Sequence, residues 1–265
     1  MDKKFVGWTF NPSKINLSKL SIPLSRLPVE FDGYRIAQLS DFHLGTWLEG
    51  QDIIHIVEIV NQLEPDLVAI TGDFVNSDPE RYAPILIQAL SKLKAKDCSV
   101  AVLGNHDHYT NSILIREVLQ KSNIVELRNR IHPIQRNSAY LYLAGIDDHL
   151  TRNDDLPSVI DQIPDENSSV ILLAHEPDFA DISSKSGKFD MQISGHTHGG
   201  QICLPYLGNL YLPGLGRKYP SGKYQVDDMV LYTNRGLGTS WLKLRYNCPP
   251  EISVFTLRSP YNQNH

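Results

Sequence analysis

The sequence predicts an α/β fold in which a parallel β-sheet carries helices on its faces. Three apolar runs alternate with three segments of helical periodicity in the first half of the chain: residues 34–39, 52–63, 67–70, 80–93, 99–103 and 112–121. This alternation is typical of βαβ units, which place parallel strands side by side. Each apolar run also stops at a polar turn. Because ligands bind beyond the carboxyl ends of parallel strands, we expect a functional site at that edge.

The second half of the chain has a different rhythm. Alternating residues predict an antiparallel pair at 131–136 and 139–144, followed by a short helix at 154–160. Further apolar runs predict four strands: residues 170–173, 191–193, 229–233 and 251–257. Residues 204–223 are rich in Leu, Pro, Gly and Tyr and show little regular pattern. No repeat, low-complexity tract or linker divides the sequence, so we expect a single domain over residues 1–265.

The N-terminal segment, residues 1–29, is basic. From residue 3 to residue 29 it contains no acid and five cations: Lys3, Lys4, Lys14, Lys19 and Arg26. Apolar and polar residues alternate from Ile15 to Leu24 with one slip, which predicts an edge strand with a β-bulge. The alternative is contact of residues 3–29 with an anionic membrane surface.

Composition argues against several classes of protein. The net charge of −5 argues against a nucleic-acid partner. The cysteines are far apart and form no C-x-x-C motif, so we expect no disulfide framework and a reducing compartment. No apolar run approaches the roughly 18 residues of a transmembrane helix. We expect a cytoplasmic protein without an obligate protein partner, with peripheral contact at the inner face of the membrane as the alternative.

The turns after the apolar runs are rich in residues that bind metals. In chain order these are Asp41, His43, Asp73, Asn105, His175, His196 and His198. Such a set of carboxylates, imidazoles and one amide suits manganese, iron or zinc. Seven side chains are too many for one tetrahedral ion, but they fit two divalent ions that share a carboxylate. One such turn usually serves turn geometry. Five of them after successive apolar runs favour a metal site.

The chemistry expected of two such ions is hydrolysis of a phosphate ester. Two ions bring four positive charges, of which Asp41 and Asp73 cancel two and a bridging hydroxide cancels one. The remaining charge attracts the ester and stabilises its transition state, and metal-bound water supplies the nucleophile. The departing alkoxide needs a proton, for which His106 is our candidate. A nearby cation lowers the pKa of that imidazole, so its protonated form needs an acceptor.

The chain resembles the calcineurin-like metallophosphoesterase superfamily in the order of five motifs: Asp41-x-His43, Gly72-Asp73, Gly104-Asn105-His106-Asp107, His175 and Gly195-His196-x-His198. The resemblance implies a four-layer αββα sandwich, with two mixed β-sheets flanked by helices, in place of a single parallel sheet. It also implies roles for the candidate residues. Asp41, His43 and His198 would hold one ion, Asn105, His175 and His196 the other, with Asp73 bridging and His106 as the acid.

The chain departs from the family pattern at Asn76. Family members often carry an Asp three residues after the bridging Asp, where it orients the catalytic His. A neutral amide favours an imidazolium less than a carboxylate does. Asp107, our second candidate catalytic residue, or Asp78 would have to compensate.

Two other segments have a functional and a structural interpretation. Arg235 lies in a Gly-rich turn where a guanidinium can bind a phosphate, and a surface ion pair is the equal alternative. The apolar residues from Tyr206 to Leu215 would either hold an acyl chain or cover the open end of a sheet. A third polar turn, residues 147–149, is expected to be structural.

These inferences predict a dinuclear metal hydrolase that cleaves phosphodiester or pyrophosphate bonds. Residues 40–45, 199–202 and 235–240 are similar to a bacterial branch that includes diacylglucosamine pyrophosphatases. This similarity, the basic N-terminus and the apolar loop indicate a lipid-linked or nucleotide-linked substrate such as UDP-diacylglucosamine. One alternative is a phosphomonoesterase acting on proteins or nucleotides. Another is a scaffold without catalysis, which is expected to have lost ligands, although none is missing here.

Overall fold

Two six-stranded sheets form the centre of the fold. The computed structural model describes residues 5–7 and 10–261. The first sheet has the order β2 (Asn16–Pro23), β16 (Glu251–Arg258), β3 (Arg35–Leu39), β4 (Leu67–Thr71), β5 (Cys98–Val102) and β6 (Ile124–Glu126). Strands β3 to β5 are parallel, as the alternation in the sequence predicts. Strand β6 is parallel to β5, whereas β16 is antiparallel to β3. The sheet is therefore mixed.

The second sheet is built entirely from the second half of the chain. Its order is β13 (Gly222–Val226), β14 (Met229–Thr233), β10 (Met191–Ser194), β9 (Ser169–Leu173), β8 (Ala139–Gly145) and β7 (Arg130–Arg136). Strands β8, β9, β10 and β14 are parallel, and β7 and β13 are antiparallel edges. This arrangement corrects the single parallel sheet and confirms the two mixed sheets implied by the family resemblance.

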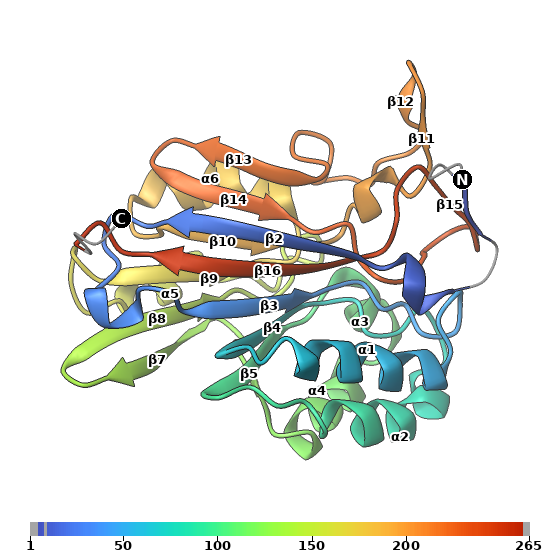
Figure 1. The fold of residues 1–265 in the computed structure, drawn as a ribbon, viewed down its shortest axis with the longest axis horizontal. Coiled ribbons are helices and arrows are strands. Elements are labelled where there is room, and N and C mark those ends of the chain that lie inside the picture. Colours follow the sequence, from blue (N-terminus) through green and yellow to red (C-terminus); the bar gives the residue numbers. More distant parts are fainter. Residues whose placement is uncertain (1–4, 8–9, 262–265) are drawn as a thin grey trace.

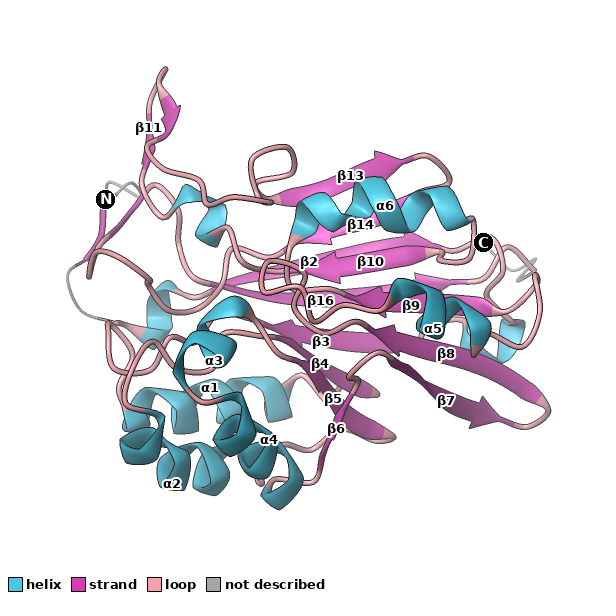
Figure 2. Ribbon diagram, turned by 180° about the vertical axis from the view of Figure 1, so that it is seen from behind, coloured by secondary structure: helices cyan, strands magenta, loops and turns pink. Residues whose placement is uncertain are grey.

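The two sheets pack face to face with helices outside (Figures 1 and 2). Apolar side chains of both sheets, such as Phe255 and Ile171, fill the space between them. The outer face of the first sheet packs on α1 (Gly50–Gln62), α2 (Pro79–Leu90) and α4 (Ser112–Lys121). The outer face of the second sheet packs on α5 (Leu156–Asp161) and α6 (Ala180–Ser183). Because each sheet buries both faces, its central strands read as continuous apolar runs.

Several short elements were not expected from the sequence. They include α3 (Asn105–Thr110), β15 (Arg245–Tyr246) and a hairpin of β11 (Cys203–Leu204) and β12 (Gly208–Asn209). Strands β6 and β13 were not expected either. The hairpin lies in the segment whose sequence showed little pattern. Among the described residues, each helix is too short or too polar to cross a bilayer.

The N-terminal segment contains an edge strand without the expected bulge. The register of β2 against β16 is continuous from Asn16 to Pro23. Leu17 is exposed on the outer face, so Leu20 and Ile22 stay in one alternation and no slip is required. Farther upstream, β1 (Phe5–Gly7) pairs with β15. Residues 1–4 and 8–9, part of the segment for which membrane contact was an alternative, lie outside the described residues.

Candidate metal centre

The candidate ligands lie in turns at the carboxyl ends of strands from both sheets. The turns after β3, β4, β9 and β10 carry Asp41 and His43, Asp73, His175, and His196 and His198, and Asn105 begins α3 after β5. Asp41, His43, Asp73, His196 and His198 all have positive φ, between 44° and 71°. Residues other than Gly rarely adopt this backbone conformation, and residues with such backbone strain cluster at functional sites. The site therefore has a strained backbone framework.

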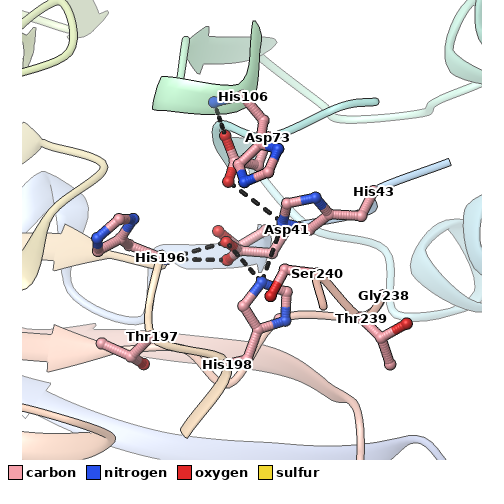
Figure 3. A network of polar contacts seen from close by, with 12 residues as sticks. Asp41, His43, Asp73, His106, His196, Thr197, His198, Gly238, Thr239 and Ser240 are labelled. Atoms are coloured by element: carbon pink, nitrogen blue, oxygen red, sulfur yellow. Dashed lines mark hydrogen bonds and ion pairs between the residues drawn. The ribbon is translucent and has the colours of Figure 1, made fainter. Parts of the chain in front are cut away.

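One group of candidate ligands consists of Asp41, His43 and His198, all buried (Figure 3). The Nε2 atoms of His43 and His198 are 3.0 Å apart, and His198 Nε2 is 3.6 Å from Asp41 Oδ1. Burial, and then the charge of His43, holds the pKa of His198 well below its usual range. His198 is therefore neutral near pH 7, which is the form that binds a metal.

A second group consists of Asp73, His175 and His196. His175 Nδ1 donates to the carbonyl of Thr71 at 2.6 Å, and His196 Nε2 donates to the carbonyl of Gly214 at 2.8 Å. In neutral rings, His175 Nε2 and His196 Nδ1 then both present lone pairs. These two atoms are only 3.2 Å apart. A proton on His175 can separate these two nitrogens, in keeping with the raised pKa of that ring. When both rings are neutral, the two lone pairs fit a divalent metal.

Asp73 lies between the two groups. Its Oδ2 is 3.2 Å from His43 Nε2 and 3.3 Å from His175 Nε2. Burial opposes ionisation of Asp73, but His175 and His43 hold the pKa of this carboxyl well below its usual range. Burial alone would lower the pKa of His175, but Asp73 raises it well above the usual value. The Asp73 carboxylate therefore contacts one histidine of each group.

The turn of residues 104–107 places three expected site residues differently. Asn105 Oδ1 is buried and has no hydrogen-bond partner among the described residues, as a metal ligand would be before an ion binds. His106 lines the cavity above the two groups, and its ring centroid is 4.6 Å from that of His43. Burial lowers the pKa of His106 below its usual value, although the nearby charge of Asp73 opposes this shift. The Oδ1 atom of Asn76 is buried and has no hydrogen-bond partner among the described residues.

Asp107 acts on the backbone and not on His106. Its carboxylate accepts hydrogen bonds from the backbone N–H groups of Asp73, Phe74 and Gly104, at 2.9, 2.9 and 3.0 Å. Burial and the nearby charge of Asp73 raise the pKa of Asp107 to about 7. The residue ties the turn that carries Asp73 to the turn that carries Asn105. It is a positioning residue, and the expectation that it orients His106 finds no contact to support it.

The centre opens into a cavity of about 530 Å³. Five of the candidate ligands line it: His43, Asp73, Asn105, His196 and His198. The cavity is also lined by apolar and aromatic side chains: Tyr109, Leu150, Tyr211, Pro213 and Trp241. The cavity therefore combines a polar floor with an apolar wall, as ligand sites commonly do.

Arg235 lies apart from this cavity. Its Nε donates to Glu251 Oε2 at 2.9 Å, and it is not among the residues that line the cavity. The turn of residues 147–149 belongs to a polar network in which Asp147 binds His108 at 2.7 Å and Arg116 at 3.0 Å. The N–H of His149 donates to Glu176 Oε2 at 3.3 Å, beside the candidate ligand His175.

Two contributors to the site gave no clear signal in the sequence. Arg245 is fully buried, and its Nη2 lies 3.2 Å from His198 Nδ1, so that Nε2 of His198 faces the centre. The same guanidinium group donates to the carbonyl groups of Arg235 and Gly238. Tyr109 follows His106 by three residues on α3 and lies beside it, with ring centroids 5.9 Å apart. That helical spacing could have indicated Tyr109, but α3 itself was not expected.

Comparison with known proteins places the chain in a family. Residues 34–200 match the family described as calcineurin-like phosphoesterase. The chain is 35% identical to the uncharacterized metallophosphoesterase YkuE of Bacillus subtilis, over 94% of this chain and 87% of YkuE. It is 28% identical to the phosphodiesterase YaeI of Escherichia coli, over 84% and 82% of the two chains. The chain therefore belongs to the calcineurin-like phosphoesterases and is a hydrolase that acts on phosphoester bonds.

Two further comparisons concern length and fold. A transmembrane protein with metallophosphoesterase domain from Danio rerio is 30% identical over 90% of this chain, which spans only 56% of that relative. The solved structure of a 5'-nucleotidase precursor from Thermus thermophilus has a TM-score of 0.51 at 10% identity, over 84% of this chain and 54% of the other. This last likeness shows the fold alone.

Proposed function

We propose that the protein cleaves phosphodiester or pyrophosphate bonds at a centre of two divalent ions, namely manganese, iron or zinc. The ligands would be two sets of three, with Asp73 shared between them: Asp41, His43 and His198, and Asn105, His175 and His196. The observation that carries this proposal is the convergence of ring nitrogens and a carboxylate oxygen: His175 Nε2 lies 3.2 Å from His196 Nδ1 and 3.3 Å from Asp73 Oδ2. When bound, such ions supply Lewis-acid charge for the phosphoryl group and lower the pKa of water.

The side chains around the ligands would complete the reaction. His106 lines the cavity beside His43, and its ring would give a proton to the departing oxygen. The nearby charge of Asp73 favours the protonated ring that this role requires, although burial lowers the pKa of His106 below its usual value. Asp107 would keep Asp73 and Asn105 at a fixed separation through its three backbone contacts.

The apolar wall of the cavity supports a substrate with substituents on both sides of the scissile bond. A phosphomonoester would leave Tyr211, Pro213 and Trp241 without a partner, whereas the second substituent of a diester or pyrophosphate would contact them. A lipid-linked or nucleotide-linked group suits these aromatic and apolar side chains. Arg235 would bind substrate only if it left Glu251, so we assign it a smaller part.

A pair of chromogenic substrates tests the proposal. Protein loaded with manganese is expected to hydrolyse bis(4-nitrophenyl) phosphate at least about tenfold faster than 4-nitrophenyl phosphate, because the apolar wall binds the second ring. The same assay is then run with a lipid-linked sugar pyrophosphate. A faster monoester rate would favour the phosphomonoesterase, and metal-loaded protein that turns over none of the three would contradict hydrolysis.

A further inference from the structure

An uncharged hairpin projects from the molecule beside the candidate metal centre. Strands β11 and β12 stand out from the body of the fold in both views (Figures 1 and 2). At the tip, Tyr206 is 106% and Leu207 81% exposed. Four more exposed apolar side chains lead from the hairpin to the adjoining loop: Leu210, Tyr211, Trp241 and Leu242. We call these six residues the hairpin patch.

We propose that the hairpin patch docks on the surface of a phospholipid bilayer. From residue 202 to residue 216 the chain contains no charged side chain, so the hairpin can enter the interface without burying a charge. Its tyrosines and tryptophan have an apolar body and a polar tip, which suits the headgroup region. Lys243 follows Leu242, is exposed, and has no salt-bridge partner among the described residues, so it would contact lipid phosphates.

The shape of the hairpin favours a bilayer over a protein partner. A stable protein interface uses about 20–30 residues on each side, which a narrow hairpin tip does not offer. A fluid lipid surface needs no complementary pocket and admits a few protruding apolar side chains.

The hairpin is also joined directly to the catalytic region. The base of β12 lies against the turn that carries His196 and His198: a Cβ on Gly200 would be 2.6 Å from the Cβ of Asn209. Tyr211 and Trp241, whose ring centroids are 6.0 Å apart, belong both to the hairpin patch and to the wall of the cavity. Docking would therefore bring the mouth of the cavity to the membrane surface. This inference goes beyond the proposed function and does not depend on turnover.

Sedimentation with lipid vesicles tests the inference. The probes are phosphatidylcholine vesicles, alone and with phosphatidylglycerol, mixed with the full chain. We expect the wild type to sediment with both, and more strongly with the anionic vesicles. The double variant Tyr206→Ser/Leu207→Ser should lose at least about tenfold in partition coefficient, because it removes two large side chains from the apolar interface. The variant should retain wild-type turnover of bis(4-nitrophenyl) phosphate, since neither residue lines the cavity.

A matched control replaces an exposed tyrosine and an exposed aliphatic residue elsewhere. Tyr261→Ser/Ile113→Ser changes side chains that are 66% and 70% exposed and should leave vesicle binding unchanged. The inference would be overturned if the wild type did not sediment, or if both double variants bound equally. Analytical ultracentrifugation gives a further test. If the hairpin substitution converted a dimer to a monomer and left vesicle binding unchanged, the patch would be an interface between copies of the chain and the inference would be overturned. Folding of each variant is checked by its thermal unfolding.

Discussion

Asp73 is the residue on which both halves of the candidate centre converge. One carboxylate oxygen faces His43 and His175, and the other accepts the backbone N–H of His106 at 2.9 Å. The same residue thus fixes the ligands and the expected proton donor. Its own position is fixed by Asp107, which binds its backbone N–H. Geometry at the centre is therefore maintained by a chain of direct contacts and not by packing alone.

Replacing His106 tests the role of the proton donor. The variant His106→Asn should lower kcat for a phosphodiester by about 10²–10⁴-fold, the usual contribution of general acid catalysis. Metal content, measured by elemental analysis, should remain that of the wild type. The control is His108→Asn on the same short helix, because His108 binds Asp147 and does not line the cavity. Equal losses in both variants would indicate damage to α3 instead of loss of the acid.

The ionised carboxylate of Glu251 is expected to contribute to the free energy of unfolding. The buried carboxylate accepts hydrogen bonds from Arg235 Nε at 2.9 Å and from Tyr232 at 2.6 Å. Burial would raise its pKa, but Arg235 and hydrogen bonds from its neighbours lower it below the usual value. A depressed folded-state pKa contributes stability that is fully present above the unfolded pKa, about 4.3 for Glu, and is lost as pH falls through the folded value.

Urea unfolding of Glu251→Gln measures this contribution. The variant should be less stable than the wild type by about 2–3 kcal/mol at pH 7, because a charged hydrogen bond is lost and Arg235 keeps its charge. The difference should be constant above about pH 5 and should shrink as the pH falls below about 4.3, where the carboxyl takes up a proton in the unfolded chain before it does so in the folded protein. A difference that does not depend on pH would show that charge at Glu251 is unimportant.

Among the structural elements, the close approach of the turns after β4 and β5 sets the positions of two candidate ligands. At Gly72 φ is +90°, and a Cβ there would lie 2.6 Å from Gly104 N and 2.7 Å from His175 Nδ1. These two turns carry Asp73 and Asn105. Only glycine allows them to approach so closely while keeping this backbone conformation.

The variant Gly72→Ala tests the importance of this close approach between the two turns. It should lose about 2 kcal/mol or more in the free energy of unfolding, since it combines left-handed strain with a backbone clash, and its turnover should fall sharply. Gly187→Ala is the matched control: φ is +66°, but nothing lies within 4 Å of the added Cβ. The control should lose about 1 kcal/mol and keep its activity. Similar losses in the two variants would show that strain, and not the close approach, determines the effect.

At the level of the whole molecule, the two six-stranded sheets meet at one site. Asp41 follows β3 of the first sheet, yet its carboxylate accepts the backbone N–H of His196, which follows β10 of the second, at 3.0 Å. Between the sheets, Gln38 donates to the carbonyl of Ser194 at 2.9 Å. A complete centre therefore requires that the sheets be packed together, and bound ions should in turn stabilise the fold.

Removing the metals tests this coupling. Protein treated with a chelator should unfold at a lower temperature than protein with manganese at about 100 times its Kd, where each ion contributes about 2.7 kcal/mol. For a chain of this size, that corresponds to roughly 5–10 °C per ion. The variant Asp73→Asn should show a much smaller shift. Identical melting temperatures with and without metal would contradict coupling between the centre and the fold.

Much of the fold could be predicted from the sequence because its central strands are buried on both faces. The runs at 67–70 and 170–173 are continuously apolar, and they became β4 and β9 nearly unchanged. The division into two sheets depended on the family resemblance, since local periodicity does not specify which strands pair. The hairpin of β11 and β12 was missed because two-residue strands have no periodicity.

The residues at the centre were easier to predict than their supporting contacts. Asp41, Asp73 and the histidines stand at strand ends, where sequence position alone indicates a shared site. The contacts that support them depend on three-dimensional placement. Arg245 reaches His198 from 47 positions away, and Asp107 binds the backbone of Asp73 across 34 positions, so neither contact could be predicted from local sequence.

The most direct test of the two-ion hydrolase is a titration of metal-free protein with manganese, followed by turnover of bis(4-nitrophenyl) phosphate. We predict that activity rises and reaches a plateau at two equivalents per chain, and that Asp73→Asn gives no comparable activity at any ratio. A plateau at one equivalent, or metal-saturated wild type without turnover, would contradict a centre in which Asp73 joins two ions for hydrolysis.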